Sequence, residues 1–196
     1  MEALSDGVIA VIITIMVLQL PVPRGAEISA LKDVVPVFLT YVLSYVYIGI
    51  YWNNHHHLLQ ATQHVSGAIL WANLNLLFWL SLFPFATAWA GAHPLASWPL
   101  AVYGTAMLFA GIAYVILTRA LIAHHGMKSV LASSIGRDRK GVMSLVIYVA
   151  GVGLAFVQPW AAVACYVSVA VMWFVPDRRI EKKLSASQHG EQVTHE

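Results

Sequence analysis

Charged residues are scarce in this chain. Only 10% of its 196 residues are Asp, Glu, Lys or Arg, whereas 59% are hydrophobic, and the mean hydropathy is +0.71. Soluble domains carry about 25% charged residues, so this composition excludes an ordinary soluble domain and indicates a polytopic membrane protein in a lipid bilayer. The net charge of +2 is too small to indicate nucleic-acid binding, and we expect no nucleic-acid partner.

Cysteine and membrane-embedded carboxylates are also scarce. The single cysteine, Cys165, cannot form an internal disulfide, and its apolar surroundings indicate a small hydrophobic side chain. Of the nine acidic residues, only Asp6 falls inside an apolar stretch long enough to cross a membrane, and it lies near the start of that stretch. A proton-coupled pump or transporter needs titratable groups near the membrane midplane. The sequence therefore argues against that class.

Six apolar stretches reach the length of about 17 residues at which a helix can cross a bilayer. We therefore predict an all-α polytopic membrane protein with six transmembrane helices per subunit. Pro84 predicts a kink in the third stretch, because proline removes a backbone donor and clashes with the preceding turn. The stretches run approximately over Ala3 to Val22, Val34 to Asn53, Val65 to Ala88, Trp98 to Ile122, Gly141 to Val157 and Trp160 to Pro176.

Lysine and arginine are sorted between the two sides of the membrane that six crossings define. Nine of them fall on the side of both termini and two, Arg24 and Lys32, on the other. Because cytoplasmic loops carry the excess of basic residues, we expect both termini in the cytoplasm and the chain in the cell inner (plasma) membrane. Residues 181–196 are polar and mixed in charge, which predicts a disordered cytoplasmic tail.

Asp6 has two interpretations. In the first, Ser5 and Asp6 cap the first helix, where their oxygens accept N–H groups and a negative charge meets the positive end of the helix dipole. In the second, Asp6 contacts the end of the second stretch, because six alternating crossings place both segments on the cytoplasmic side. The candidate partners there are Trp52, Asn53, Asn54, His55, His56 and His57.

The three adjacent histidines at 55–57 raise the hypothesis of a metal or haem site, because imidazole is a common metal ligand. Successive residues of a helix point about 100° apart, so at most two of the three can share one ion. Haem sites in helix bundles need histidines that face each other across the interior, whereas all nine histidines lie near the ends of stretches, in loops or in the tail. We predict no metal site and no cofactor, with a His-rich membrane oxidoreductase as the alternative.

The segment LSDGVIAVIITIMVL, followed by WNNHHHLL at the end of the second apolar stretch, resembles the bacterial branch of the lysosomal potassium channel family, the transmembrane protein 175 type. The signature of that family opens the first helix with Arg-x-x-x-Phe-Ser-Asp. Ser5 and Asp6 match it, Leu4 stands in place of the phenylalanine, and the arginine would precede Met1.

This resemblance covers about residues 1–180, which we therefore interpret as the channel domain. It implies an ion channel rather than an enzyme, with potassium as the permeant ion. It also implies a homotetramer of six-helix subunits in which the first helices line a pore on the four-fold axis. The sequence indicates no other protein partner.

Positions 11, 14, 15 and 18 lie on one side of the first predicted helix by their i, i+3, i+4, i+7 spacing. The resemblance assigns apolar constriction layers to Val11 and Leu18, with Ile15 as a further candidate, and a hydroxyl layer to Thr14. The sequence has no Thr-Val-Gly-Tyr-Gly filter, so helix side chains must form any conducting path. Periodicity alone leaves open that this face packs against another helix. A non-conducting assembly or transport protein is then the remaining alternative.

Overall fold

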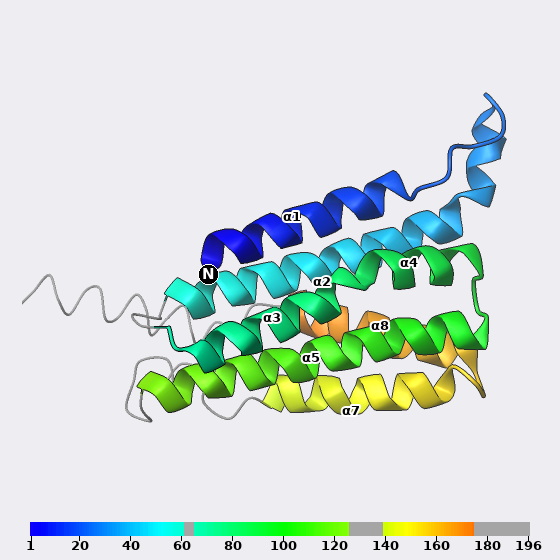
Figure 1. The fold of residues 1–196 in the computed structure, drawn as a ribbon. Coiled ribbons are helices and arrows are strands. Elements are labelled where there is room, and N and C mark those ends of the chain that lie inside the picture. Colours follow the sequence, from blue (N-terminus) through cyan, green and yellow to red (C-terminus); the bar gives the residue numbers. More distant parts are fainter. Residues whose placement is uncertain (61–64, 126–138, 175–196) are drawn as a thin grey trace, which may run out of the picture.

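The structure is a computed structural model that describes residues 1–60, 65–125 and 139–174. Within these ranges every regular element is a helix, as the sequence predicts (Figure 1). The elements are α1 (Glu2–Leu18), the short 3-10 helix η1 (Ile28–Asp33), α2 (Val35–Gln60), α3 (Gly67–Ser81), α4 (Phe83–Ala92), α5 (Ser97–His125), α7 (Arg139–Leu154) and α8 (Pro159–Phe174).

The third predicted stretch is divided into two helices. α3 ends at Ser81, α4 begins at Phe83, and Pro84 lies in the first turn of α4. The missing N–H of proline costs little in a first turn, where that donor has no partner within the helix. The sequence predicts a kink at Pro84, and the structure has a helix boundary there, with α4 as a separate ten-residue helix.

Two predicted helix ends are wrong. α1 ends at Leu18 rather than at Val22, because Pro21 and Pro23 disfavour helix in the residues before them. α2 runs to Gln60, seven residues beyond the predicted Asn53. The segment after Asn53 contains no proline or glycine to stop the helix. The histidines at 55–57 consequently lie on α2 and not in a loop.

Length and composition qualify three described helical segments to cross a bilayer: α2, α3 together with α4, and α5 as far as His124. α8 is a shorter apolar helix, and α1 and α7 have 17 and 16 residues. These apolar helices agree with the predicted membrane class. The predicted tail at 181–196 lies outside the described residues.

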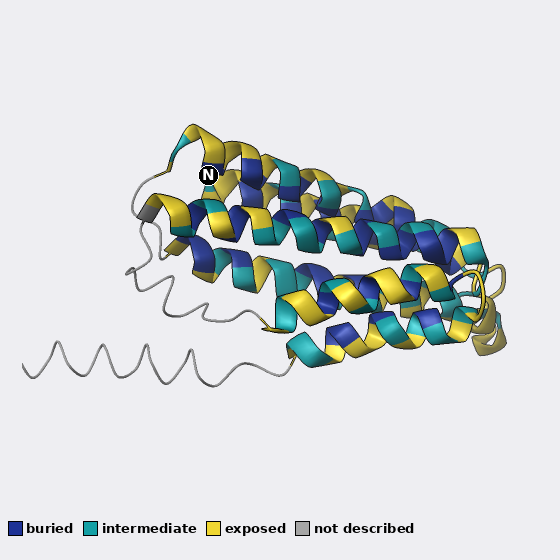
Figure 2. Cartoon of the chain, turned by 90° about the horizontal axis from the view of Figure 1, so that it is seen from below, coloured by how far each residue is buried: buried dark blue, intermediate teal, exposed yellow. Residues whose placement is uncertain are grey.

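The helices form one bundle, with α1 along one side of it (Figure 1). α1 contacts α2, α3 and α4, while α5 contacts α3, α4 and α7, and α8 packs beside α7. Buried positions alternate with exposed ones along each helix (Figure 2). α7 and α8 approach closely at Gly151, where an added Cβ would lie 2.5 Å from the ring of Tyr166.

Candidate pore helix and its anchoring network

α1 has one face inside the subunit. Its buried residues are Ser5, Ile9, Ile12 and Met16, and their spacing of three and four residues gathers them on one side of the helix. This side packs against α2, α3 and α4. Only the opposite side of α1 is therefore open to contact with other molecules.

The opposite face of α1 carries the predicted stripe. Val11 is 54% exposed, Ile15 41% and Leu18 82%, and Thr14 is exposed as well. The structure thus places these four side chains on the outside of the subunit. Three apolar side chains on such a face must meet lipid, a second copy or a pore.

The hydroxyl of Thr14 is already engaged as a donor. Its Oγ1 donates to the carbonyl oxygen of Val11 at 2.8 Å, and a threonine hydroxyl has only one proton to give. The residue is exposed, so Oγ1 can still accept a hydrogen bond from outside the subunit or contact a cation there. Thr14 can accordingly act there only as an acceptor, which suits a cation and not an anion.

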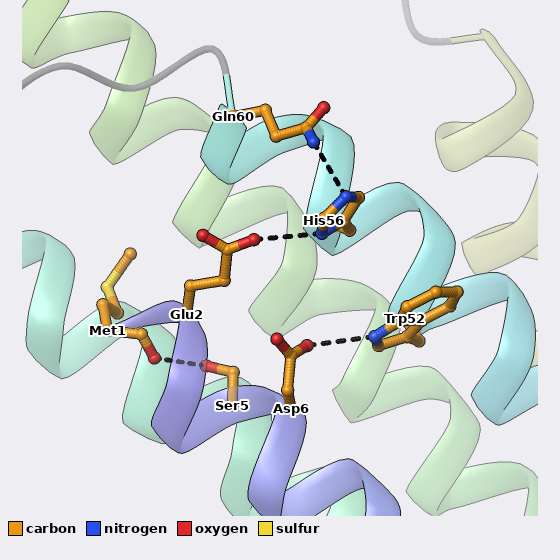
Figure 3. A network of polar contacts seen from close by, with 7 residues as sticks. All are labelled: Met1, Glu2, Ser5, Asp6, Trp52, His56 and Gln60. Carbon is orange, nitrogen blue, oxygen red and sulfur yellow. Dashed lines mark hydrogen bonds and ion pairs between the residues drawn. The ribbon is translucent and has the colours of Figure 1, made fainter.

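Polar side chains join the start of α1 to α2 and α3, and Figure 3 shows the contacts with α2. We call this set the anchoring network: Glu2, Ser5, Asp6, Trp52, His55, His56 and Asn73. Trp52 Nε1 donates to Oδ1 of Asp6 at 3.0 Å, and the Trp52 ring stacks on His56 with the ring centroids 5.7 Å apart. The structure thus brings Asp6 to the predicted end of α2 and shows Trp52 as its partner there. Asn53 is exposed and joins none of these contacts in the described part of the chain.

Glu2 supplies a second contact to α2. Its Oε1 lies 3.0 Å from Nδ1 of His56, a distance typical of an ion pair, although Nδ1 has no hydrogen bond of good alignment. The other ring nitrogen, Nε2, lies 2.9 Å from the amide nitrogen of Gln60. Since an amide nitrogen can only donate, Nε2 accepts this bond only while the ring is uncharged, so the bond to Gln60 and an ion pair with Glu2 belong to different charge states of His56. The sequence analysis did not identify Glu2.

A buried branch of the anchoring network joins α1, α2 and α3. Asn73 Nδ2 donates to Oγ of Ser5 at 2.9 Å, and Ser5 Oγ in turn donates to the carbonyl oxygen of Met1 at 3.2 Å. The other amide atom, Asn73 Oδ1, lies 2.7 Å from Nε2 of His55. Because Oδ1 can only accept, Nε2 carries the proton of His55. All three side chains are at most 1% exposed.

The capping interpretation of Ser5 and Asp6 is wrong. α1 begins at Glu2 with Met1 as its N-cap, and no side chain caps it. Both residues therefore lie about one turn inside the helix, and Ser5 donates to a carbonyl instead of accepting from an N–H. An asparagine within an apolar stretch predicts a hydrogen bond between helices, and Asn73 makes such bonds to α1 and α2, although it was not among the predicted site residues.

The side chains of the three adjacent histidines at 55–57 lie in different environments. His55 is buried, His56 is half-buried and His57 is exposed. Among the described residues, no group of three or more His, Cys, Asp or Glu side chains is arranged to hold a metal ion. The haem or metal alternative thus gains no support from the geometry.

Similar proteins are potassium channels. Residues 1–84 match the family described as endosomal/lysosomal potassium channel TMEM175. A potassium channel of a Chryseobacterium species is 49% identical over 184 residues, which are 94% of this chain and 96% of the relative. A potassium channel of Streptomyces collinus is 37% identical over 91 residues, 44% of either chain.

A solved structure matches the fold as well. It is the crystal structure of a lysosomal potassium-selective channel TMEM175 homolog from Chamaesiphon minutus, with a TM-score of 0.76 and 26% identity. The match covers 89% of this chain and 94% of that one. The sequence similarity, which extends over nearly the whole length of the Chryseobacterium relative, and the shared fold lead to one conclusion: this chain belongs to the TMEM175 potassium channel family.

Proposed function

We propose that this chain is the subunit of a potassium-selective channel whose pore is lined by α1. One observation carries the proposal. The face of α1 with Val11, Thr14 and Leu18 lies outside the subunit, while the opposite face is buried in it. A conducting path along this face is incomplete in one subunit and needs α1 of further copies.

Four copies around one axis are the proposed assembly, as the family resemblance implies. Each subunit then contributes six crossings, namely α1, α2, α3 with α4, α5, α7 and α8. This count returns both termini to the cytoplasmic face of the inner membrane. At 1.5 Å per residue, the 17 residues of α1 span about 25 Å, somewhat less than the hydrocarbon core of about 30 Å.

The stripe on α1 would form a narrow apolar passage. Rings of Val11 and Leu18, with Ile15 between them, dewet easily and make an ion shed water. The hydroxyl oxygens of four Thr14 side chains then replace part of that water. Potassium gives up its hydration shell more easily than sodium, so the passage favours potassium without a carbonyl filter and without a cofactor.

The anchoring network holds α1 against α2 and α3 and does not touch the ion. Its proposed members are Ser5, Asp6, Trp52, His55 and His56 from the sequence analysis, joined by Glu2 and Asn73 from the structure. Asp6 is therefore a residue of the helix contact at the cytoplasmic end and not an ion ligand.

The test is the selectivity of the reconstituted channel. We expect reversal potentials under potassium and sodium gradients to show a preference for potassium, and Thr14→Val to reduce that preference, because the change removes four acceptor oxygens and keeps the side-chain shape. Ser168→Ala is the control, since Ser168 is an exposed hydroxyl on α8 that also bonds within its own helix. Equal permeability to both ions in the unmodified channel, or an unchanged ratio in Thr14→Val, would contradict the proposal.

A further inference from the structure

A row of buried polar side chains reaches the back of α1 further from the cytoplasmic end than the anchoring network does. Thr87 Oγ1 on α4 lies 2.7 Å from Oγ of Ser44 on α2. The Ser44 oxygen lies 2.9 Å from the hydroxyl of Tyr103 on α5, and Thr87 Oγ1 lies 4.0 Å from Sδ of Met16 on α1. The four side chains are 0% to 3% exposed, so water does not compete for these contacts.

The contact to sulfur is the longest of the three. Thr87 Oγ1 donates to Sδ of Met16, because a thioether can only accept. With its one proton in this bond, Thr87 accepts from Ser44, and Ser44 then accepts from Tyr103. The two short bonds between hydroxyls hold the Thr87 oxygen beside the sulfur.

Met16 sits at the level of the proposed constriction. It lies between Thr14 and Leu18 in sequence and on the opposite, buried side of α1. Methionine is unbranched and has three rotatable side-chain bonds, so packing alone holds it loosely. The donor on Thr87 favours one position of the sulfur and adds a polar contact to the apolar packing of the buried face of α1.

The anchoring network is too distant to set the rotation of α1 at Met16 by itself. Asp6 and Met16 are ten residues apart, which corresponds to about 15 Å along the helix. Thr87 belongs to α4, and α4 is separated from α3 at Leu82. Met16 is therefore contacted by α4, whereas the start of α1 is held by α2 and α3.

We propose that Thr87 is a positioning residue for the pore constriction. By holding Met16, it sets the rotation of α1 about its own axis and so the distance of Leu18 from the pore axis. Tyr103 and Ser44 orient the Thr87 hydroxyl for this task. The proposal rests on the proposed function, because it assumes that Leu18 faces the pore.

The experiment compares three variants in the reconstituted channel. Thr87→Val keeps the shape and removes the donor, Thr87→Ser restores a hydroxyl, and Thr118→Val is the matched control. Thr118 is a buried threonine on α5 whose Oγ1 has no hydrogen-bond partner among the described residues. Two readouts are recorded: the potassium-to-sodium permeability ratio, and the rate at which silver ions block Leu18→Cys in a Cys165→Ser background.

We expect Thr87→Val to lower the permeability ratio about two- to fivefold, the scale of one lost buried hydrogen bond, and to change the rate of silver block. Thr87→Ser should recover most of both readouts, and Thr118→Val should leave both unchanged. If Thr87→Val does not assemble, Tyr103→Phe removes the first donor of the row and should shift both readouts in the same direction.

Two failures are distinguishable. Block of Leu18→Cys in the otherwise unmodified channel, with both readouts unmoved by Thr87→Val or moved equally by Thr118→Val, overturns the role of Thr87 alone. Absence of block at Leu18→Cys overturns the assignment of the pore to α1, and the role of Thr87 falls with it.

Discussion

The two ends of α1 are held in different ways. Near its start, Glu2, Ser5 and Asp6 all bond through side chains to neighbouring helices or lie at ion-pair distance from them. Near its end, Leu18 is 82% exposed, and α1 is held through apolar packing and the sulfur of Met16. Polar side-chain contacts thus hold the start of α1, whereas packing and one contact to a sulfur atom hold its end. Each polar contact at the start can be broken singly.

The largest effect is expected from Asn73→Leu. This change removes the bridge between Ser5 and His55 and leaves Nε2 of the buried His55 without its partner Asn73, which costs about 1–3 kcal/mol. Ser5 keeps its bond to the carbonyl oxygen of Met1. Thermal unfolding in detergent should show a large loss of stability. Asn75→Leu is the control on the same helix, because Asn75 is only half-buried, and it should cost much less. Equal losses of stability in the two variants would show that the bonds of Asn73 to Ser5 and His55 do not stabilise the fold.

A smaller effect is expected at the contact between Asp6 and Trp52. A hydrogen bond to a charged group contributes about 1.5–3 kcal/mol, and partial exposure reduces this figure. A double-mutant cycle of Asp6→Asn and Trp52→Phe should therefore give a coupling energy of about 1 kcal/mol. The same cycle with Trp71→Phe, an exposed ring on α3, should be additive. Additivity in the first cycle would remove Trp52 from the anchoring network.

The smallest effect is expected from Glu2→Gln. The Glu2 and His56 side chains are 47% and 31% exposed, and ion pairs in contact with solvent contribute about 0.2–1 kcal/mol before screening by salt. The loss of stability should shrink in 1 M salt, where the Debye length is about 3 Å. In a His56→Gln background, Glu2→Gln should have no further effect. A loss that is independent of salt would indicate packing rather than charge.

Local sequence patterns predicted the parts of this account that depend on a single helix. The i, i+3, i+4, i+7 spacing placed Val11, Thr14, Ile15 and Leu18 on one side of α1, and that side is exposed. Pro84 predicted a kink, and a helix boundary lies there, because the effect of proline is confined to one turn. The alternation of crossings predicted that Asp6 lies on the same side of the membrane as the end of α2, and the structure shows the two in contact.

The choice of partner between helices could not be read from the sequence. Trp52, rather than Asn53 or a histidine, contacts Asp6 because of how α1 and α2 pack, and no pattern along either helix encodes that angle. Asn73 joins Ser5 to His55 only once α3 is in place. The end of α2 was also missed, because polar residues after Asn53 look like a loop until the buried Leu58 and Leu59 tie them to the bundle.

The central claim is that the exposed face of α1 lines the conducting path, and cysteine accessibility tests it most directly. Single cysteines at Val11, Thr14 and Leu18, each in a Cys165→Ser background, should allow silver ions to block the potassium current. Cysteines at Ile9 and Ile12, on the buried face of the same helix, should leave the current unaffected. Block at the three exposed positions alone is the result this account predicts. Block at the buried positions, or at none of the five, would contradict it.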